Sequence, residues 1–264
     1  LPLRLFNLQS LQTLDIRWCG HLTVLPSAVI HMESLRHLKM FKNVGVSGMR
    51  LPEGIVRLTK LLTLTGIYVS SNTARELSEL RQLRRLGIMD FDDENLTELY
   101  ESLMEMQGLL ILSLEAKRPC SKHHLRISNT FRPPLLLRKL QLEGLLENMP
   151  SWLSSMENLT KLRLGYSHLS ESPMLVLEGL PNLKNLTLWH AYDAKRIGKE
   201  FCRAGRFVKL EVLSIASHVL EEWTELGEGA LPSLQYLHFH NCLRLRMLPE
   251  GLQLVTTMKQ LDLL

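Results

Sequence analysis

Leucine and other apolar residues recur along the chain in the pattern L-x-x-L-x-L, whose last positions alternate between apolar and polar residues. Successive side chains of an extended strand point to opposite faces, so this alternation predicts a short strand with one buried face. The pattern returns every 22 to 28 residues, which is typical of a tandem repeat. The central leucines of its eleven copies are Leu14, Leu38, Leu64, Leu86, Leu112, Leu140, Leu162, Leu186, Leu213, Leu237 and Leu261.

The segments that return from one strand to the next have a pattern of their own. Four of them contain leucine or methionine followed by proline, and then apolar residues at three-residue spacing. Proline cannot continue a hydrogen-bond ladder, and the three-residue spacing suits a short helical or 3-10 turn. The four prolines are Pro26, Pro52, Pro150 and Pro249.

One short strand cannot bury its apolar face alone, whereas stacked copies form a parallel sheet over a continuous core. We therefore expect an α/β solenoid, the leucine-rich-repeat horseshoe, with a concave parallel β-sheet and an irregular or short-helical convex side. About eleven repeats should form one domain over residues 1–264, truncated at both ends because the chain begins and stops inside a repeat. Residues 115–134 and 190–207 break the regular spacing, and we expect binding loops or solvated bulges there.

In each strand, the positions that alternate with the buried leucines should face solvent on the concave side. These positions are therefore candidates for partner binding. Several are apolar or aromatic, and aromatic residues and arginine dominate interface hot spots. Lys139 and Lys161 add positive potential that would steer an acidic protein partner, and Glu143 interrupts it. The candidate partner-binding residues are Arg17, Lys39, Phe41, Ile67, Met89, Arg163, Trp189, Tyr236, His238 and His240.

Composition and motifs argue against catalysis, metal binding and nucleic-acid binding. The net charge of +4 is only a mild excess for a nucleic-acid binder. Cys120 with His123 and His124 lacks a convincing fourth ligand, so no metal is expected. Gly198-Lys199 lacks the rest of a phosphate-binding G-x-x-x-x-G-K-S/T motif. We therefore expect no enzyme, no catalytic residue and no cofactor in this chain.

The cysteines and the hydropathy bear on the compartment. The four cysteines are dispersed without a close pair, which favours a reducing environment and a cytoplasmic protein. No apolar run approaches the ~20 residues that span a bilayer. Three glycosylation sequons, at Asn95, Asn158 and Asn185, argue the other way, although a glycan on the last two would crowd the strands.

Short motifs in the second half are more specific than the repeat itself. They are Pro133-Pro134 before Leu137-Arg138-Lys139-Leu140, Met149-Pro150-Ser151-Trp152, Gly179-Leu180-Pro181-Asn182-Leu183, His190-Ala191-Tyr192-Asp193-Ala194, Glu221-Glu222-Trp223 and Leu248-Pro249-Glu250-Gly251-Leu252. With them, residues 133–264 resemble the C-terminal repeat region of plant intracellular immune receptors of the nucleotide-binding, leucine-rich-repeat type, and of the coiled-coil subclass in particular. Residues 1–132 share the general repeat.

This resemblance implies a protein-recognition domain that binds a pathogen effector or a guarded host protein. It also implies that the region packs on the receptor's nucleotide-binding module and helps to hold the receptor inactive. ADP or ATP would then bind only that absent module, and the full receptor could be membrane-associated or nuclear as well as cytoplasmic. Two alternatives stay open, namely the ectodomain of a receptor outside the cell and a substrate adaptor with an F-box upstream.

Overall fold

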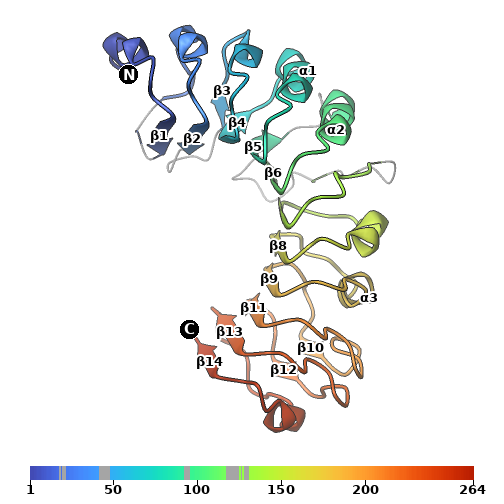
Figure 1. The fold of residues 1–264 in the computed structure, drawn as a ribbon. Helices are drawn as coiled ribbons and strands as arrows, with labels where there is room; N and C mark the ends of the chain where they lie inside the picture. Colours follow the sequence, from blue (N-terminus) through green and yellow to red (C-terminus); the bar gives the residue numbers. More distant parts are fainter. Residues whose placement is uncertain are drawn as a thin grey trace. The chain divides into compact units, whose positions relative to one another are not determined.

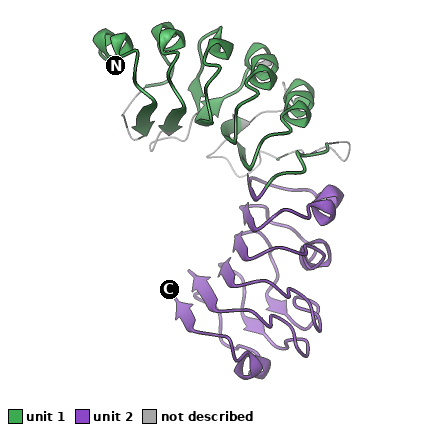
Figure 2. Ribbon diagram, viewed as in Figure 1, with its two compact units in different colours: residues 1–125, 130–137 green, residues 126–129, 138–264 purple. Residues whose placement is uncertain are grey.

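The computed structural model describes residues 1–17, 19, 22–41, 48–91, 96–116, 125, 127 and 131–264. The chain forms two compact units, residues 1–125 with 130–137 and residues 126–129 with 138–264 (Figure 2). In each unit, parallel strands line one side and short helical turns line the other (Figure 1). Each unit is therefore a stack of strand-and-return repeats, and the predicted solenoid of leucine-rich repeats is confirmed within both.

The described part of unit 1 has five long strands in sequence order. The central leucines pair in register from strand to strand, as in Leu14↔Leu38 and Leu86↔Leu112, so the repeat spacing sets the strand register. Within the described residues of this unit, the elements are η1 (Leu3–Asn7), β1 (Thr13–Arg17), η2 (Ser27–His31), β2 (His37–Phe41), β3 (Met49–Arg50), η3 (Ile55–Arg57), β4 (Thr63–Tyr68), α1 (Ser71–Glu79), β5 (Arg85–Phe91), α2 (Leu96–Glu105) and β6 (Ile111–Ala116).

Unit 2 continues the same pattern with more regular strands, and again the central leucines are direct register partners, from Leu140↔Leu162 to Leu237↔Leu261. A second, two-stranded parallel sheet lies on the return side. The elements are β7 (Lys139–Glu143), η5 (Ser151–Ser155), β8 (Lys161–Gly165), α3 (Met174–Leu177), β9 (Asn185–Trp189), β10 (Arg196–Ile197), β11 (Val212–Ala216), β12 (Glu222–Trp223), β13 (Tyr236–His240), η6 (Glu250–Leu254) and β14 (Gln260–Leu263).

Proline begins the return turns as predicted. Pro26, Pro150 and Pro249 are the N-cap residues of η2, η5 and η6, with extended ψ angles of 139°, 122° and 137°. After Pro52 the left-handed Gly54 takes the N-cap position of η3. Each proline ends an extended run, and the apolar residues that follow return to the core, as Val29 and Leu153 do with no exposed side-chain surface.

The structure corrects the alternation in β4. Gly66 has a positive φ of 78°, and the pairing with β5 shifts there, so that Ile67 rather than Gly66 is the partner of core residue Ile88. One extra residue in a strand reverses the facing of all that follow. Ile67 is completely buried, and the prediction that it faces solvent is wrong.

A second correction concerns Met89, which the alternation placed on the surface and which is only 5% exposed. The pairing of β5 with β6 is irregular after Ile88, and Asp90 adopts a left-handed φ of 55°. The amide of Gly48 donates a hydrogen bond of 2.7 Å to Asp90 Oδ2. Gly48, directly before β3, therefore lies at the ends of β4 and β5, where the sequence predicted open solvent.

Residues 190–207 are solvated in part, since Lys199 and residues 203–206 are exposed, but the stretch also packs into the fold. Ile197 lies in β10, which pairs with β12, and Phe201, Cys202 and Phe207 are almost completely buried. This long return therefore adds to the core of unit 2. Most of the other irregular stretch, residues 115–134, lies outside the described residues. No helix in the described part of the chain is long and apolar enough to cross a bilayer.

Candidate protein-recognition surface

The outward side chains of unit 2 form rows across its sheet. We call the surface that these rows form the sheet face. Strand register places Arg163, Thr187, Ser214 and His238 in one row. The next row contains Gly165, Trp189, Ala216 and His240. The regular burial patterns of β9 and β13, in which every second residue is buried, confirm that these side chains alternate as predicted.

Two neighbours, Glu143 and Trp189, contact the side chain of Arg163. Its Nε atom donates a hydrogen bond of 2.8 Å to Glu143 Oε1, and Gln141 Nε2 donates to the same oxygen at 2.7 Å. The side chain of Glu143 is only 6% exposed, whereas that of Arg163 is 34% exposed. The guanidinium also lies 5.2 Å from the centre of the Trp189 ring, within the range of a cation–π contact. The buried carboxylate thus fixes a cation beside an aromatic ring.

Trp189 has small neighbours on both adjacent strands, Gly165 and Ala216. A Cβ atom at Gly165 would lie 2.9 Å from Cγ of Glu143, so glycine leaves the room that the buried glutamate needs. On the other side, the Trp189 ring lies 5.4 Å from the ring of His240. The indole is partly exposed between a cation and an imidazole, and the packing holds its position.

The last strands extend this surface with polar groups. The Nδ1 atom of His238 lies 2.8 Å from Oδ2 of Asp262, and both side chains are about one-fifth to one-quarter exposed at 21% and 24%. A hydrogen bond from Gln260, and to a smaller extent one from His238, holds the pKa of Asp262 below its ordinary value. Tyr236 stacks near His238 with a ring-centre distance of 6.3 Å. Tyr236, His238 and His240 are all partly exposed, as predicted.

A histidine cluster that the sequence did not predict lies where the strands end. The rings of His190 and His218 are 4.2 Å apart, and Tyr166 is 5.6 Å from His190. Burial, and then the proximity of His218 and His168, lower the pKa of His190. Tyr166 and His190 have left-handed φ angles of 53° and 49°, which non-glycine residues adopt uncommonly. Both residues directly follow a strand. This shared position in the repeat is the feature of the sequence from which the cluster could have been predicted.

Unit 1 matches the prediction less well. Arg17 is exposed and bonds to Asp15 of the same strand at 2.7 Å, which holds the pKa of Asp15 below its ordinary value. Lys39 is partly exposed. The side chain of Phe41 lies outside the described residues, and Ile67 and Met89 are buried. Partner binding by the correctly oriented residues stays a prediction.

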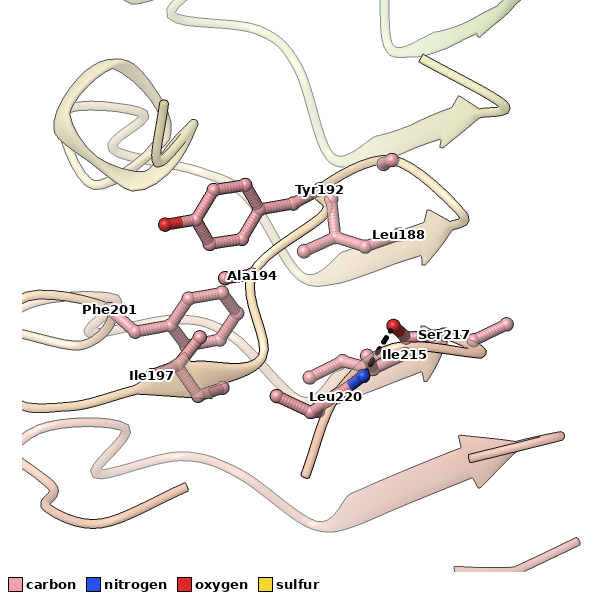
Figure 3. A pocket seen from close by; sticks show the side chains of 10 residues that line it. Leu188, Tyr192, Ala194, Ile197, Phe201, Ile215, Ser217 and Leu220 are labelled. Atoms are coloured by element: carbon pink, nitrogen blue, oxygen red, sulfur yellow. Dashed lines mark hydrogen bonds between the residues drawn. The ribbon is translucent and has the colours of Figure 1, made fainter. Parts of the chain in front are cut away.

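Two hollows in the described part of the chain bear on ligand binding. One is a cavity of about 20 Å³ in the core of unit 2, lined by apolar side chains including Leu188, Ile197 and Phe201 (Figure 3). It has room for roughly one water molecule. The other is an open hollow of about 410 Å³ on the helical side of unit 1, between the ends of α1 and α2. No group of three or more potential metal ligands occurs among the described residues, and the Cys120, His123 and His124 set lies outside them.

The fold and this face define a class of protein, the leucine-rich-repeat solenoid, which is a scaffold for protein interactions. A family model described as "Leucine-rich repeat region" matches residues 1–264, and the chain belongs to this family. A leucine-rich-repeat protein of Leptospira interrogans, LIC12759, has a similar structure with a TM-score of 0.55 and 19% identity, covering 100% of this chain and 80% of its own. That likeness confirms the fold.

The curated relatives confirm the resemblance to plant disease resistance proteins. The putative disease resistance protein At1g59780 of Arabidopsis thaliana is 31% identical over 99% of this chain and 27% of its own length. The disease resistance protein RPM1 of the same plant is 28% identical over 83% of this chain and 23% of its own. The chain therefore spans about a quarter of the length of these relatives.

Proposed function

We propose that this chain is the recognition domain of a plant immune receptor, and that the sheet face of unit 2 binds a pathogen effector or a guarded host protein. The carrying observation is the set of partly exposed aromatic, arginine and histidine side chains held in register on hydrogen-bonded strands. Such residues supply most of the free energy of protein interfaces, and a rigid sheet lowers the entropic cost of binding. The disease resistance relatives support the biological setting.

The same face can serve the receptor internally. In the proposed full-length protein, part of it packs on a nucleotide-binding domain that carries the ADP or ATP, and this contact helps to keep the receptor inactive. The chain itself is then a single repeat domain of a larger cytoplasmic receptor, and it binds neither nucleic acid nor nucleotide. Among the described residues, the partly exposed cation and indole that lie side by side are Arg163 and Trp189 of unit 2, so we place the partner contact there.

The test uses the full-length receptor in plant leaf tissue with two matched variants. Trp189→Ala removes the exposed indole from the sheet face. Leu175→Ala removes a leucine that is 59% exposed on α3, on the helical side of the same unit, and serves as the control. The hypersensitive response to pathogen challenge and the amount of receptor protein are measured for both.

Loss of the response with Trp189→Ala, at normal receptor levels, supports partner binding by the sheet face. Cell death without a pathogen supports the internal contact instead. An unchanged response in both conditions contradicts the proposal. Mass spectrometry of the native receptor checks the compartment, because a glycan on Asn158 would place this domain outside the cytoplasm.

A further inference from the structure

Two lysines face each other across the first strands of unit 2. Lys139 and Lys161 are register partners on β7 and β8, and both side chains are exposed. Neighbouring strands lie about 4.8 Å apart, so the two like charges begin from adjacent backbone positions and repel each other. Within the described part of the chain, neither lysine forms an ion pair. The pair of lysines therefore does not stabilise the sheet.

The nearest acid on these two strands is already engaged. Glu143 is the sole carboxylate of β7 and β8, and it is buried against Arg163 and Gln141. Its charge therefore faces the Arg163 guanidinium. The two strands carry three cations, Lys139, Lys161 and Arg163, and one carboxylate. The surplus positive charge is that of Lys139 and Lys161, and it is exposed to solvent at the start of the strands.

Trp189 lies at the far end of the next strand, β9. It is the register partner of Gly165, which is four residues beyond Lys161 along β8. Four residues of a strand span about 13 Å. An extended ligand segment that runs along β8 could therefore place acidic side chains at the lysines and an apolar side chain at the indole, with about four residues between them.

We infer that the sheet face of unit 2 binds a protein segment that carries carboxylates, with its acidic residues between Lys139 and Lys161 and an apolar residue against Trp189. This inference rests on the proposed recognition function and names the chemistry of the partner. Charge complementarity carries it, because a carboxylate would relieve the repulsion between two lysines that have no ion-pair partner in the described part of the chain. The tethered Arg163 stands between the two contacts and faces the same ligand.

The probe is a labelled oligoglutamate peptide with one phenylalanine about four residues from its acidic run. Its binding to the 264-residue chain is followed by fluorescence anisotropy at low and high salt. Lys139→Glu with Lys161→Glu should weaken binding by about tenfold or more, and high salt should do the same to the unmodified chain. Lys60→Glu with Lys199→Glu makes the same change in net charge at exposed positions away from the sheet face, and should leave binding unchanged.

Two further measurements separate a specific site from general attraction. A second peptide has serine in place of phenylalanine. It should bind the unmodified chain more weakly than the phenylalanine peptide does, whereas the two peptides should bind the Trp189→Ala variant with equal affinity. Lys161→Glu alone should weaken binding while raising the melting temperature, because it turns a like-charged pair into an opposite-charged pair. A folded variant with lower affinity and higher thermal stability cannot be explained by misfolding.

Equal binding by the two charge-reversal variants would overturn the inference. So would binding of an oligothymidylate of similar length as tightly as the peptide, because the site would then favour nucleic-acid phosphates over a protein segment. If oligoglutamate does not bind but Trp189→Ala abolishes the pathogen response in the receptor, the recognition function stands and only the acidic chemistry of the partner is refuted.

Discussion

The corrected position of Ile67 leads to a quantitative prediction for Ile67→Ala. Simple alternation places this side chain in solvent, where its removal would change the free energy of unfolding by less than about 0.5 kcal/mol. The structure buries it completely, opposite Ile88, after the bulge at Gly66. The solvent-exposed and buried placements of Ile67 therefore predict changes in the free energy of unfolding that differ by about 2 kcal/mol or more.

The magnitude follows from the atoms removed. Ile to Ala deletes three buried carbon atoms, and at about 0.8 kcal/mol for each the lost transfer free energy is about 2.4 kcal/mol. The remaining cavity adds to this, since the flanking strands can collapse only in part, and measured core truncations of this kind cost about 2–5 kcal/mol. We expect Ile67→Ala to lower the free energy of unfolding by an amount in that range.

The assay is urea unfolding followed by far-UV circular dichroism. Repeat arrays can lose cooperativity, so a change in midpoint counts only if the slope of the transition is unchanged. The matched control is Ile111→Ala, which makes the same chemical change at an outward, half-buried position of β6 and should cost about 1 kcal/mol or less. An effect below about 0.5 kcal/mol at Ile67 would refute the bulge and restore the simple alternation.

Three further predictions concern unit 2. Leu162→Ala, at a core position 2% exposed, should cost about 2–5 kcal/mol in urea unfolding, whereas Trp189→Ala should cost only about 1 kcal/mol, and equal losses would contradict the outward placement of the indole. Burial and His218 lower the pKa of His190 in the folded chain, so the unfolded chain takes up the proton first and stability should fall as the pH drops below about 6.5. His190→Asn, which tolerates the left-handed backbone, should reduce the loss of melting temperature between about pH 7.5 and pH 5.5, and an identical loss would exclude this histidine as a cause. Burial, and then Glu178, raise the pKa of the Cys202 thiol, so Ellman's reagent should modify the exposed Cys19 in the native chain and reach Cys202 only on unfolding, as peptide mapping would show.

The sequence by itself determined the repeat, the pairing of the central leucines and the positions of the return turns. These features are local, because a leucine every second or third residue fixes which face of a short strand is buried. Stacked copies then align like residues, as the direct pairing of Leu162 with Leu186 confirms. The proline-started turns were predictable for the same reason, since proline acts on its own backbone and on the residue before it.

The sheet face was predictable only where the strands are regular. Arg163, Trp189 and His238 lie on five-residue strands without bulges, and alternation placed all three outward correctly. In β4 and β5 the same rule failed, because Gly66 inserts a residue and Asp90 receives a hydrogen bond from the distant Gly48. A glycine in a strand is a weak sign of a bulge, and it does not say which neighbour will turn inward.

Tertiary structure alone decided which charges are satisfied and which stay available. Glu143 looked like an acid that interrupts a basic surface, yet it is buried and holds Arg163 beside Trp189. The ring contact between His190 and His218 likewise joins residues from successive repeats. Burial and pairing depend on neighbours about 20 to 28 residues away, whose side-chain positions are set by packing. Periodicity specifies the direction of each side chain, but only the assembled repeats specify what it meets there.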